Sequence, residues 1–472
     1  MNISRYLTAT NSSTHSFQNS LQSAGHRNKC TGPHAGRSYA MAKSVKIVSL
    51  GCSKNTVDSE KLLKQLQFAG YRPIPGANIQ GTDIVIVNTC GFINDAKEES
   101  VDTILELAGA RKRGEIGELY VMGCLSERYR DQLIKEIPEV DGFFGVNKEE
   151  EILHSLAPNY KLLPEPERIL SGPPHYAYLK VSEGCNRNCA FCAIPGIRGR
   201  YRSTPVDELV KEAKLLETGG LRELILIAQD LTYYGRDLYG RQALVDLIRS
   251  ILDNTGIDWL RLHYLYPGSM PGGLLELIKH EPRICNYIDL PVQHISDKIL
   301  SDMKRGHTEK DTRNLLGHIR NILPGAAIRT TLITGYPGET ENDFNKLLDF
   351  VREFRFERLG VFTYSHEEDT HAHSMFTDNI PGRIKRERAD RLMELQQEIS
   401  LAKNLEMVGK EIQVLIDRKE GTQLVARSEY DSPEVDQEIF ISSEGAGEAG
   451  AGDFCKVRIT SAGDFELQAE II

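Results

Sequence analysis

Residues 182–203 read SEGCNRNCAFCAIPGIRGRYRS and place Cys185, Cys189 and Cys192 in a C-x-x-x-C-x-x-C pattern directly after a predicted strand. The neighbouring Gly184 allows such a loop to wrap closely around an iron–sulfur cluster. Three thiolates are one ligand short for a four-iron cluster, so one iron stays open for a substrate or cofactor. Structural zinc is the alternative, but zinc sites take four ligands and no fourth Cys or His lies nearby. The spacing therefore predicts a [4Fe–4S] cluster with one open iron.

A second set of cysteines lies in the N-terminal part of the chain, where Cys52, Cys90 and Cys124 end the runs SLGC, VNTC and VMGC. Each follows a predicted strand, and the carboxyl ends of parallel strands meet at one edge of a sheet. Free cysteines are also common as small buried hydrophobic residues. Three at equivalent strand ends instead favour a second cluster, again with three protein ligands.

Alternating strand and helix patterns predict an α/β fold. The first strands are expected at 46–50, 83–88 and 118–122, as an open parallel sheet. A second series at 176–182, 222–228, 258–264, 285–291, 326–334 and 357–364 is too short for a full eight-unit barrel, so we expect a partial (βα)6 barrel. Short alternating strands after residue 410 predict a small antiparallel β-barrel. The predicted domains are 44–155, a linker 156–174, 175–400 and 405–472.

The composition is that of a globular protein, with 40% apolar and 26% charged residues and a net charge of −10. No apolar run is long enough to cross a bilayer, so no membrane association is expected. Nine cysteines are too few for a disulfide framework and no signal-peptide core is visible, which predicts a cytoplasmic location. Residues 1–43 lack acidic side chains and are interpreted as a disordered tail or a misassigned start.

The cysteine loop, with Phe191 before its last cysteine, closely resembles the radical S-adenosylmethionine superfamily. In order of domains, the chain from about residue 44 resembles the methylthiotransferase family, whose last part is a TRAM domain. Within that family it is similar to the branch that modifies ribosomal protein S12. The supporting motifs are GCSKNTVDSE (51–60), NTCGFINDAKEES (88–100), GCLSERY (123–129), PEVDGFFG (138–145), AQDLTYYG (228–235), LPVQH (290–294), GYPGE (335–339) and VFTYSHEEDT (361–370).

The resemblance implies S-adenosylmethionine and two [4Fe–4S] clusters as cofactors, and an electron donor of unknown identity as a partner. Cys185, Cys189 and Cys192 would hold the cluster that cleaves S-adenosylmethionine, and Cys52, Cys90 and Cys124 the cluster that donates sulfur. It implies methylthiolation of the β-carbon of an aspartate of ribosomal protein S12. Two alternatives stay open: a tRNA adenosine methylthiotransferase, and a non-catalytic iron–sulfur electron carrier.

The charge of the terminal domain bears on the choice between protein and tRNA. Residues 405–472 contain 15 Asp and Glu against 6 Lys and Arg, a net charge of −9. A domain that binds tRNA phosphates is expected to be basic, whereas an acidic one suits a basic ribosomal protein. The charges could instead serve only solubility. The balance makes tRNA the less favoured substrate.

A few further residues are candidates for cofactor contacts. Gly335 and Gly338 form a turn after a strand, where the backbone could approach the adenosine closely; an ordinary turn between a strand and a helix is the alternative. Arg329 could pair with the cofactor carboxylate or form a structural ion pair. Gln293 follows a strand at the expected site edge, and Gly184 belongs to the cluster loop.

Overall fold

The computed structural model describes residues 42–162, 167–442 and 449–472. The predicted tail, apart from its last two residues, lies outside the described residues. The chain divides into two compact units. The first consists of the described residues within Met1–Gly51 and Leu62–Leu163, and the second of Cys52–Lys61 with the described part of Pro164–Ile472. The TRAM-like barrel thus belongs to the same compact unit as the predicted partial barrel.

The first unit is built on a parallel sheet with the strand order β2-β1-β3-β4-β5. Alternate residues of its central strands pack on opposite faces, since Val85 and Val87 join one apolar core and Ile84 and Ile86 another. This confirms the open parallel sheet. The elements are β1 (Ser44–Ser49), α2 (Ser53–Phe68), β2 (Arg72–Pro73), β3 (Ile84–Thr89), α3 (Asn94–Lys112), β4 (Glu118–Gly123), α4 (Cys124–Glu136), β5 (Gly142–Phe143) and α5 (Glu149–Leu156).

The second unit contains six parallel strands in two sheets, β10-β9-β6 and β11-β12-β13. A parallel bridge between Leu260 and Ile284 joins the two sheets. Among the described residues no pairing closes β6 onto β13, so the predicted partial barrel is confirmed as an open one. The strands are β6 (Tyr176–Lys180), β9 (Glu223–Ile227), β10 (Trp259–Leu262), β11 (Tyr287–Asp289), β12 (Ala327–Thr334) and β13 (Arg358–Thr363).

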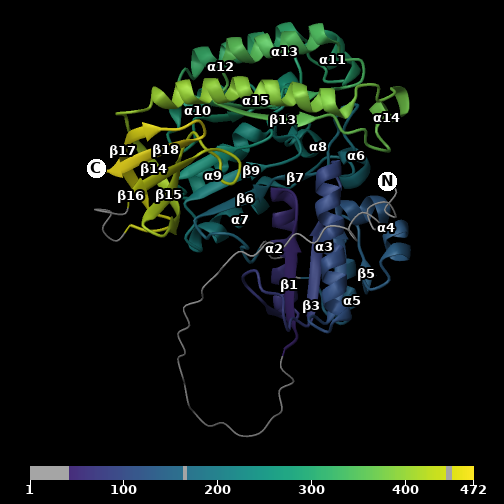
Figure 1. Ribbon diagram of the computed structural model, residues 1–472. Helices are drawn as coiled ribbons and strands as arrows, with labels where there is room; N and C mark the ends of the chain where they lie inside the picture. Colours follow the sequence, from purple (N-terminus) through teal and green to yellow (C-terminus); the bar gives the residue numbers. More distant parts are fainter. Residues whose placement is uncertain (1–41, 163–166, 443–448) are drawn as a thin grey trace. The chain divides into compact units, whose positions relative to one another are not determined.

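Helices cover the outside of these strands, and α12, α13 and α15 lie together along one side in Figure 1. Their apolar residues form one large core with the strands. The short hairpin β7 (Ser182–Glu183) with β8 (Arg202–Ser203) brackets the cysteine loop. The helices are α6 (Ile194–Arg198), α7 (Val206–Thr218), α8 (Arg236–Tyr239), α9 (Leu244–Asn254), α10 (Leu274–His280), α11 (Asp297–Asp302), α12 (Glu309–Ile322), α13 (Glu341–Phe354), α14 (His371–Met375) and α15 (Gly382–Leu405).

The C-terminal strands form a closed barrel in the order β14-β15-β16-β18-β17. Its strands are β14 (Glu411–Glu420), β15 (Gln423–Ser428), β16 (Glu438–Ser442), β17 (Phe454–Ala462) and β18 (Glu466–Ile471). The predicted small barrel is confirmed, but β16 and β18 pair in parallel rather than antiparallel. A closed ring of five strands cannot alternate direction at every pair, so one parallel pair is unavoidable.

Buried ion pairs connect this barrel to the partial barrel. Arg261 and Glu223 are fully buried, with 2.6 Å between Nε and Oε1, and Arg427 of β15 contacts the same carboxylate. Arg427 also contacts Asp417 at 2.8 Å. Because each charge has a partner of opposite sign, the cost of burying the group is offset. Among the described residues, no helix combines the length and the apolar character that crossing a membrane would require.

Replacing Glu223 with Gln should strongly destabilise this unit, because two buried guanidinium groups would lose their shared carboxylate. Removing one partner of a buried pair typically costs about 3–5 kcal/mol. We expect the first midpoint of denaturant unfolding to fall clearly for Glu223→Gln. Glu411→Gln, which breaks an exposed pair with Arg458, should leave that midpoint unchanged. Equal midpoints for Glu223→Gln and the wild type would contradict the stabilising role given to this carboxylate.

Candidate active site

The loop that carries Cys185, Cys189 and Cys192 is held in a narrow conformation by its own backbone. Gly184 has a φ of 75°, and a Cβ there would lie 2.3 Å from the carbonyl oxygen of Arg200. The Cys185 amide donates a hydrogen bond to the Gly199 carbonyl at 3.1 Å. Only glycine fits this left-handed, crowded position. The start and the end of the loop are therefore tied together around the three thiols.

Two arginines place donors against the sulfur atoms. The Arg187 amide lies 3.3 Å from Cys185 Sγ, and Arg305 Nη1 lies 3.3 Å from Cys189 Sγ. Both guanidinium groups also lie over the ring of Tyr266, at 3.9 Å for Arg187 and 4.5 Å for Arg305. Positive charge and N–H donors stabilise thiolates and tune clusters that they hold. These residues fit an anionic iron–sulfur group.

Burial raises the pKa of the Cys185 thiol to about 11 and that of Cys192 to about 12. Neighbouring cysteines raise both values further, since Cys189 acts on each of them. Without a metal these thiols are therefore neutral at physiological pH. Thiolate ligation releases protons, so loading of this site should be favoured by higher pH.

In the first unit, Cys90 and Cys124 of the second set lie at the edge formed by β1, β3 and β4, and Gly51, the residue before Cys52, lies at the same edge. Cys90 follows β3 directly and Cys124 follows β4, and these strands are neighbours in the sheet. A Cβ on Gly51, the residue before Cys52, would lie 2.5 Å from Cys90 Cβ and 2.9 Å from its Sγ. A Cβ on Gly91 would lie 2.8 Å from the carbonyl carbon of Cys124. Within the first unit, the structure thus brings Gly51 and the turns at Cys90 and Cys124 together.

The turn at Cys90 is further fixed by a serine. Ser100 Oγ accepts a hydrogen bond from the Cys90 amide at 3.0 Å and donates one to the Cys90 carbonyl at 2.9 Å. Gly123, before Cys124, has a φ of 97° and approaches Asn88 closely. Within the described residues, no three His, Cys, Asp or Glu side chains surround a position suited to a single metal ion.

The candidate cofactor contacts in the partial barrel are the turn of Gly335 and Gly338 and the residue Gln293. Gly335 and Gly338 have φ values of 75° and 81°, and Glu339 fixes their turn by accepting from the Gly335 amide at 2.7 Å and pairing with Arg388 at 2.7 Å. Gln293 lies beyond the end of β11 and pairs in parallel with Leu332 of β12; its φ of 71° is a costly conformation for a residue with a side chain. Its amide donates to the Thr331 carbonyl at 2.8 Å.

Arg329 forms structural ion pairs rather than offering its guanidinium to a cofactor carboxylate. Its guanidinium lies 3.4 Å from Asp289 and 3.4 Å from Asp436 of the C-terminal domain. Burial opposes its charge, but these carboxylates outweigh that effect and raise its pKa. The guanidinium of Arg329 is therefore occupied by these ion pairs, and Arg329 is not proposed as a cofactor contact.

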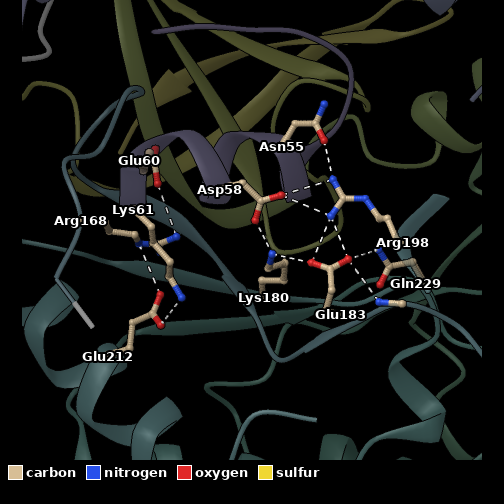
Figure 2. A network of polar contacts seen from close by, with 11 residues as sticks. Asn55, Asp58, Glu60, Lys61, Arg168, Lys180, Glu183, Arg198, Glu212 and Gln229 are labelled. Carbon is tan, nitrogen blue, oxygen red and sulfur yellow. Dashed lines mark hydrogen bonds and ion pairs between the residues drawn. The ribbon is translucent and has the colours of Figure 1, made fainter. Parts of the chain in front are cut away.

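Some residues of the site were not predicted from sequence. Arg187 lies inside the cysteine loop, so its sequence position could have indicated a role at the site. Arg305 is distant in the sequence, and nothing near it indicated its contact with Cys189. Glu183 and Arg198 flank the loop at its two ends, and their partners Asn55 and Asp58 follow Cys52 (Figure 2).

Comparisons with known proteins agree with this arrangement. Residues 179–351 match the radical SAM superfamily, residues 44–145 the uncharacterized protein family UPF0004, and residues 408–472 the TRAM domain. The solved structure of the radical S-adenosylmethionine methyltransferase TsrM from Kitasatospora setae shares the fold with a TM-score of 0.50 at 15% identity, over 68% of this chain and 75% of that one.

Curated relatives share far more sequence. The ribosomal protein uS12 methylthiotransferase RimO of Porphyromonas gingivalis strain W83 is 50% identical over 428 residues, which cover 91% of this chain and 99% of the relative. The RimO proteins of Christiangramia forsetii and Flavobacterium johnsoniae are 48% and 49% identical, over 90% of this chain and 94% and 97% of theirs. Radical SAM membership implies S-adenosylmethionine and iron–sulfur clusters as cofactors.

Substitution of Gly51 by Ala should prevent assembly of the site at Cys52, Cys90 and Cys124, because the new Cβ would collide with Cys90. The iron content of the reconstituted protein should fall by about half, since one of two four-iron clusters is lost. Gly317→Ala in α12 is the matched control, because a Cβ there meets nothing within 4 Å. Full iron content in Gly51→Ala would refute this placement of Gly51.

With two cysteine-bearing strand edges, a TRAM-type barrel and about half of its residues identical to those of its relatives, the chain belongs to the RimO family of radical SAM methylthiotransferases.

Proposed function

We propose that this protein transfers a methylthio group to the β-carbon of an aspartate in ribosomal protein S12. The observation that carries the proposal is the near full-length identity of about 50% to RimO proteins. The two cysteine sets support it, because Cys185, Cys189 and Cys192 share one loop and Cys90 and Cys124 follow adjacent parallel strands. The proposal includes a cytoplasmic location, where ribosomal proteins are found, and an electron donor that remains to be identified.

The proposed ligand roles follow the two cysteine sets. Cys185, Cys189 and Cys192 would hold the cluster that binds S-adenosylmethionine, and Cys52, Cys90 and Cys124 the auxiliary cluster. When bound, these groups supply the electron that cleaves S-adenosylmethionine and the sulfur that joins the substrate carbon. A second S-adenosylmethionine would supply the methyl group.

The protein's own residues would bind, orient and shield these groups. The Arg187 backbone amide donates to Cys185 Sγ, and the Arg305 guanidinium presents positive charge at Cys189 Sγ. The turn of Gly335 and Gly338, held by Glu339, offers backbone close to the strand ends for the cofactor. Gln293 and Gly184 are retained as proposed contacts because both lie at the same edge as the cysteine loop.

The acidic C-terminal domain supports a basic protein partner, but only its exposed acidic residues are available to one. Asp431 and Asp436 are nearly fully buried against Arg358 and Arg329, so they are not available to a partner. The acidic residues that remain at the barrel surface include Glu411, Glu420, Glu438, Glu466 and Glu470. We therefore propose this exposed acidic set, rather than the whole domain, as the source of complementarity to S12, and tRNA is not proposed as a substrate.

The substrate assignment is tested by incubating the reconstituted enzyme, S-adenosylmethionine and a reductant with S12 and, separately, with tRNA. We expect S12 to gain the mass of one methylthio group in place of a hydrogen atom on an aspartate, and the tRNA nucleosides to stay unchanged. Modified adenosine with unmodified S12 would overturn the assignment.

The roles of the two cysteine sets are separated by single substitutions. Cys189→Ala should abolish formation of 5′-deoxyadenosine, because the first cluster loses a ligand. Cys124→Ala should retain 5′-deoxyadenosine formation but lose methylthiolation of S12. Cys455→Ser, in the C-terminal barrel, is the control and should retain both activities. Undiminished 5′-deoxyadenosine formation in Cys189→Ala would rule out the first role.

A further inference from the structure

A group of charged and polar residues joins the segment after Cys52 to the strand before Cys185 (Figure 2). We name it the Arg198 cluster, and it consists of Asn55, Asp58, Lys180, Glu183 and Arg198. All five belong to the second compact unit, which includes Cys52–Lys61. None of them is a proposed ligand of either iron–sulfur cluster.

Arg198 is the centre of the Arg198 cluster. Its Nη1 lies 2.9 Å from Glu183 Oε1 and 3.2 Å from Asp58 Oδ2, and its Nη2 donates to Asn55 Oδ1 at 2.6 Å. Lys180 bridges the same two carboxylates, pairing with Asp58 and lying 2.7 Å from Glu183. One guanidinium thus contacts three residues from two distant parts of the sequence.

The charges in the Arg198 cluster balance. Arg198 has a side-chain exposure of 2% and Asp58 of 7%, so neither is solvated. Burial opposes the charge of Lys180, but Asp58 and Glu183 overcome it and raise the pKa of Lys180. Two basic and two acidic side chains therefore pair with each other and hold each other in place.

The residues of the Arg198 cluster are close in sequence to cysteines of both sets. Asn55 and Asp58 lie in the first two turns of α2, which begins directly after Cys52. Glu183 precedes Gly184 and accepts a hydrogen bond from its amide at 3.2 Å. Arg198 is the last residue of α6, the short helix that follows Cys192. A helix is rigid over two turns, so the position of Asp58 constrains that of Cys52.

Apolar contacts and a second set of ion pairs hold the same helical segment. Val57 packs in a core with Tyr178, Ile225 and Ile227. On the other side of the segment, Lys61 pairs with Glu212 at 2.9 Å, and Glu212 also lies 3.6 Å from Arg168. The segment is therefore attached at several points, and the Arg198 cluster is the attachment that reaches the residues on either side of the cysteine loop.

We propose that Asp58 and Arg198 are positioning residues that fix Cys52 with respect to the loop of Cys185. This inference rests on the proposed function. Correct placement of Cys52 would matter for delivery of sulfur to the substrate carbon and not for cleavage of S-adenosylmethionine. Misplacement by about 1 Å can cost about a hundredfold in rate. Loss of the Arg198 cluster should therefore uncouple cleavage from sulfur insertion.

The test compares Asp58→Asn and Arg198→Lys with the wild-type holoenzyme, measuring methylthiolated S12 and 5′-deoxyadenosine in the same reactions. We expect the ratio of product to 5′-deoxyadenosine to fall about tenfold or more, while 5′-deoxyadenosine formation stays within about twofold. Lysine keeps the positive charge but cannot contact Asn55, Asp58 and Glu183 together, so Arg198→Lys should also lower the ratio of product to 5′-deoxyadenosine. Glu212→Gln is the matched control and should keep the wild-type ratio, because it weakens attachment of the same segment outside the Arg198 cluster.

A second readout does not depend on turnover. In a Cys189→Ala background, the electron paramagnetic resonance spectrum of the remaining reduced cluster should change in Asp58→Asn and not in Glu212→Gln. A wild-type ratio with an unchanged spectrum would overturn the inference, as would equal loss of coupling in Glu212→Gln. If Asp58→Asn fails to fold, Asn55→Ala, which removes one neutral acceptor, decides by the same two measurements. Failure of the wild type to modify S12 would refute the proposed function, and the spectra would still test the inference.

Discussion

The parallel pairing of strands is the constraint on which both sites depend. When neighbouring strands run in the same direction, their carboxyl ends share one edge, and the residues that follow them meet there. Cys90 and Cys124 follow adjacent strands, and Gly51, which precedes Cys52, lies against Cys90. Residues separated by dozens of positions in the chain, Cys90 and Cys124, therefore lie at one edge of the sheet. The same constraint places Gln293 and the turn at Gly335 at strand ends of the partial barrel.

The turns beside the cysteines approach other atoms closely, so they need residues without a Cβ. Buried ion pairs then hold neighbouring segments in place. Gly51, Gly91, Gly123 and Gly184 stand next to cysteines, where a Cβ would overlap backbone or side-chain atoms. Buried ion pairs fix other contacts, since Glu223 joins Arg261 of the partial barrel to Arg427 of the C-terminal barrel and Arg198 pairs with Glu183 beside the cysteine loop. Such pairs contribute little net stability when intact, but removing one partner leaves an unpaired charge, so they favour one geometry over others.

Much of this could be predicted because strong periodic patterns mark long buried elements. The strands at 326–334 and 357–364 were predicted within a residue or two of β12 and β13, since apolar runs bounded by turn residues leave little choice. The two-residue strands β2 and β5 were missed, because two residues show no period. The parallel pairing of β16 with β18 follows from ring closure, a property of the whole barrel that no local segment encodes.

The cysteine motifs could likewise be recognised, because spacing and strand ends are visible in the chain, and the structure places Cys90 and Cys124 after adjacent strands. Their role as cluster ligands stays a prediction. The partners of Arg329 could not be predicted, since Asp289 and Asp436 come from distant elements and the choice between cofactor and structural pairing depends on tertiary contacts. The same holds for Arg305 at Cys189 and for Arg198 at Asp58. Long-range ion pairs leave no local periodic signal, so a sequence indicates which charges exist without indicating which of them meet.

The central claim is that this protein modifies S12, and the mass of S12 in the cell tests it most directly. S12 should be purified from cells with the gene intact, with the gene deleted, and with the deletion complemented by the wild type or by Cys189→Ala. We predict that S12 loses the mass of one methylthio substitution on deletion and regains it only with the wild-type gene. An unchanged mass of the aspartate-containing peptide after deletion would contradict the claim.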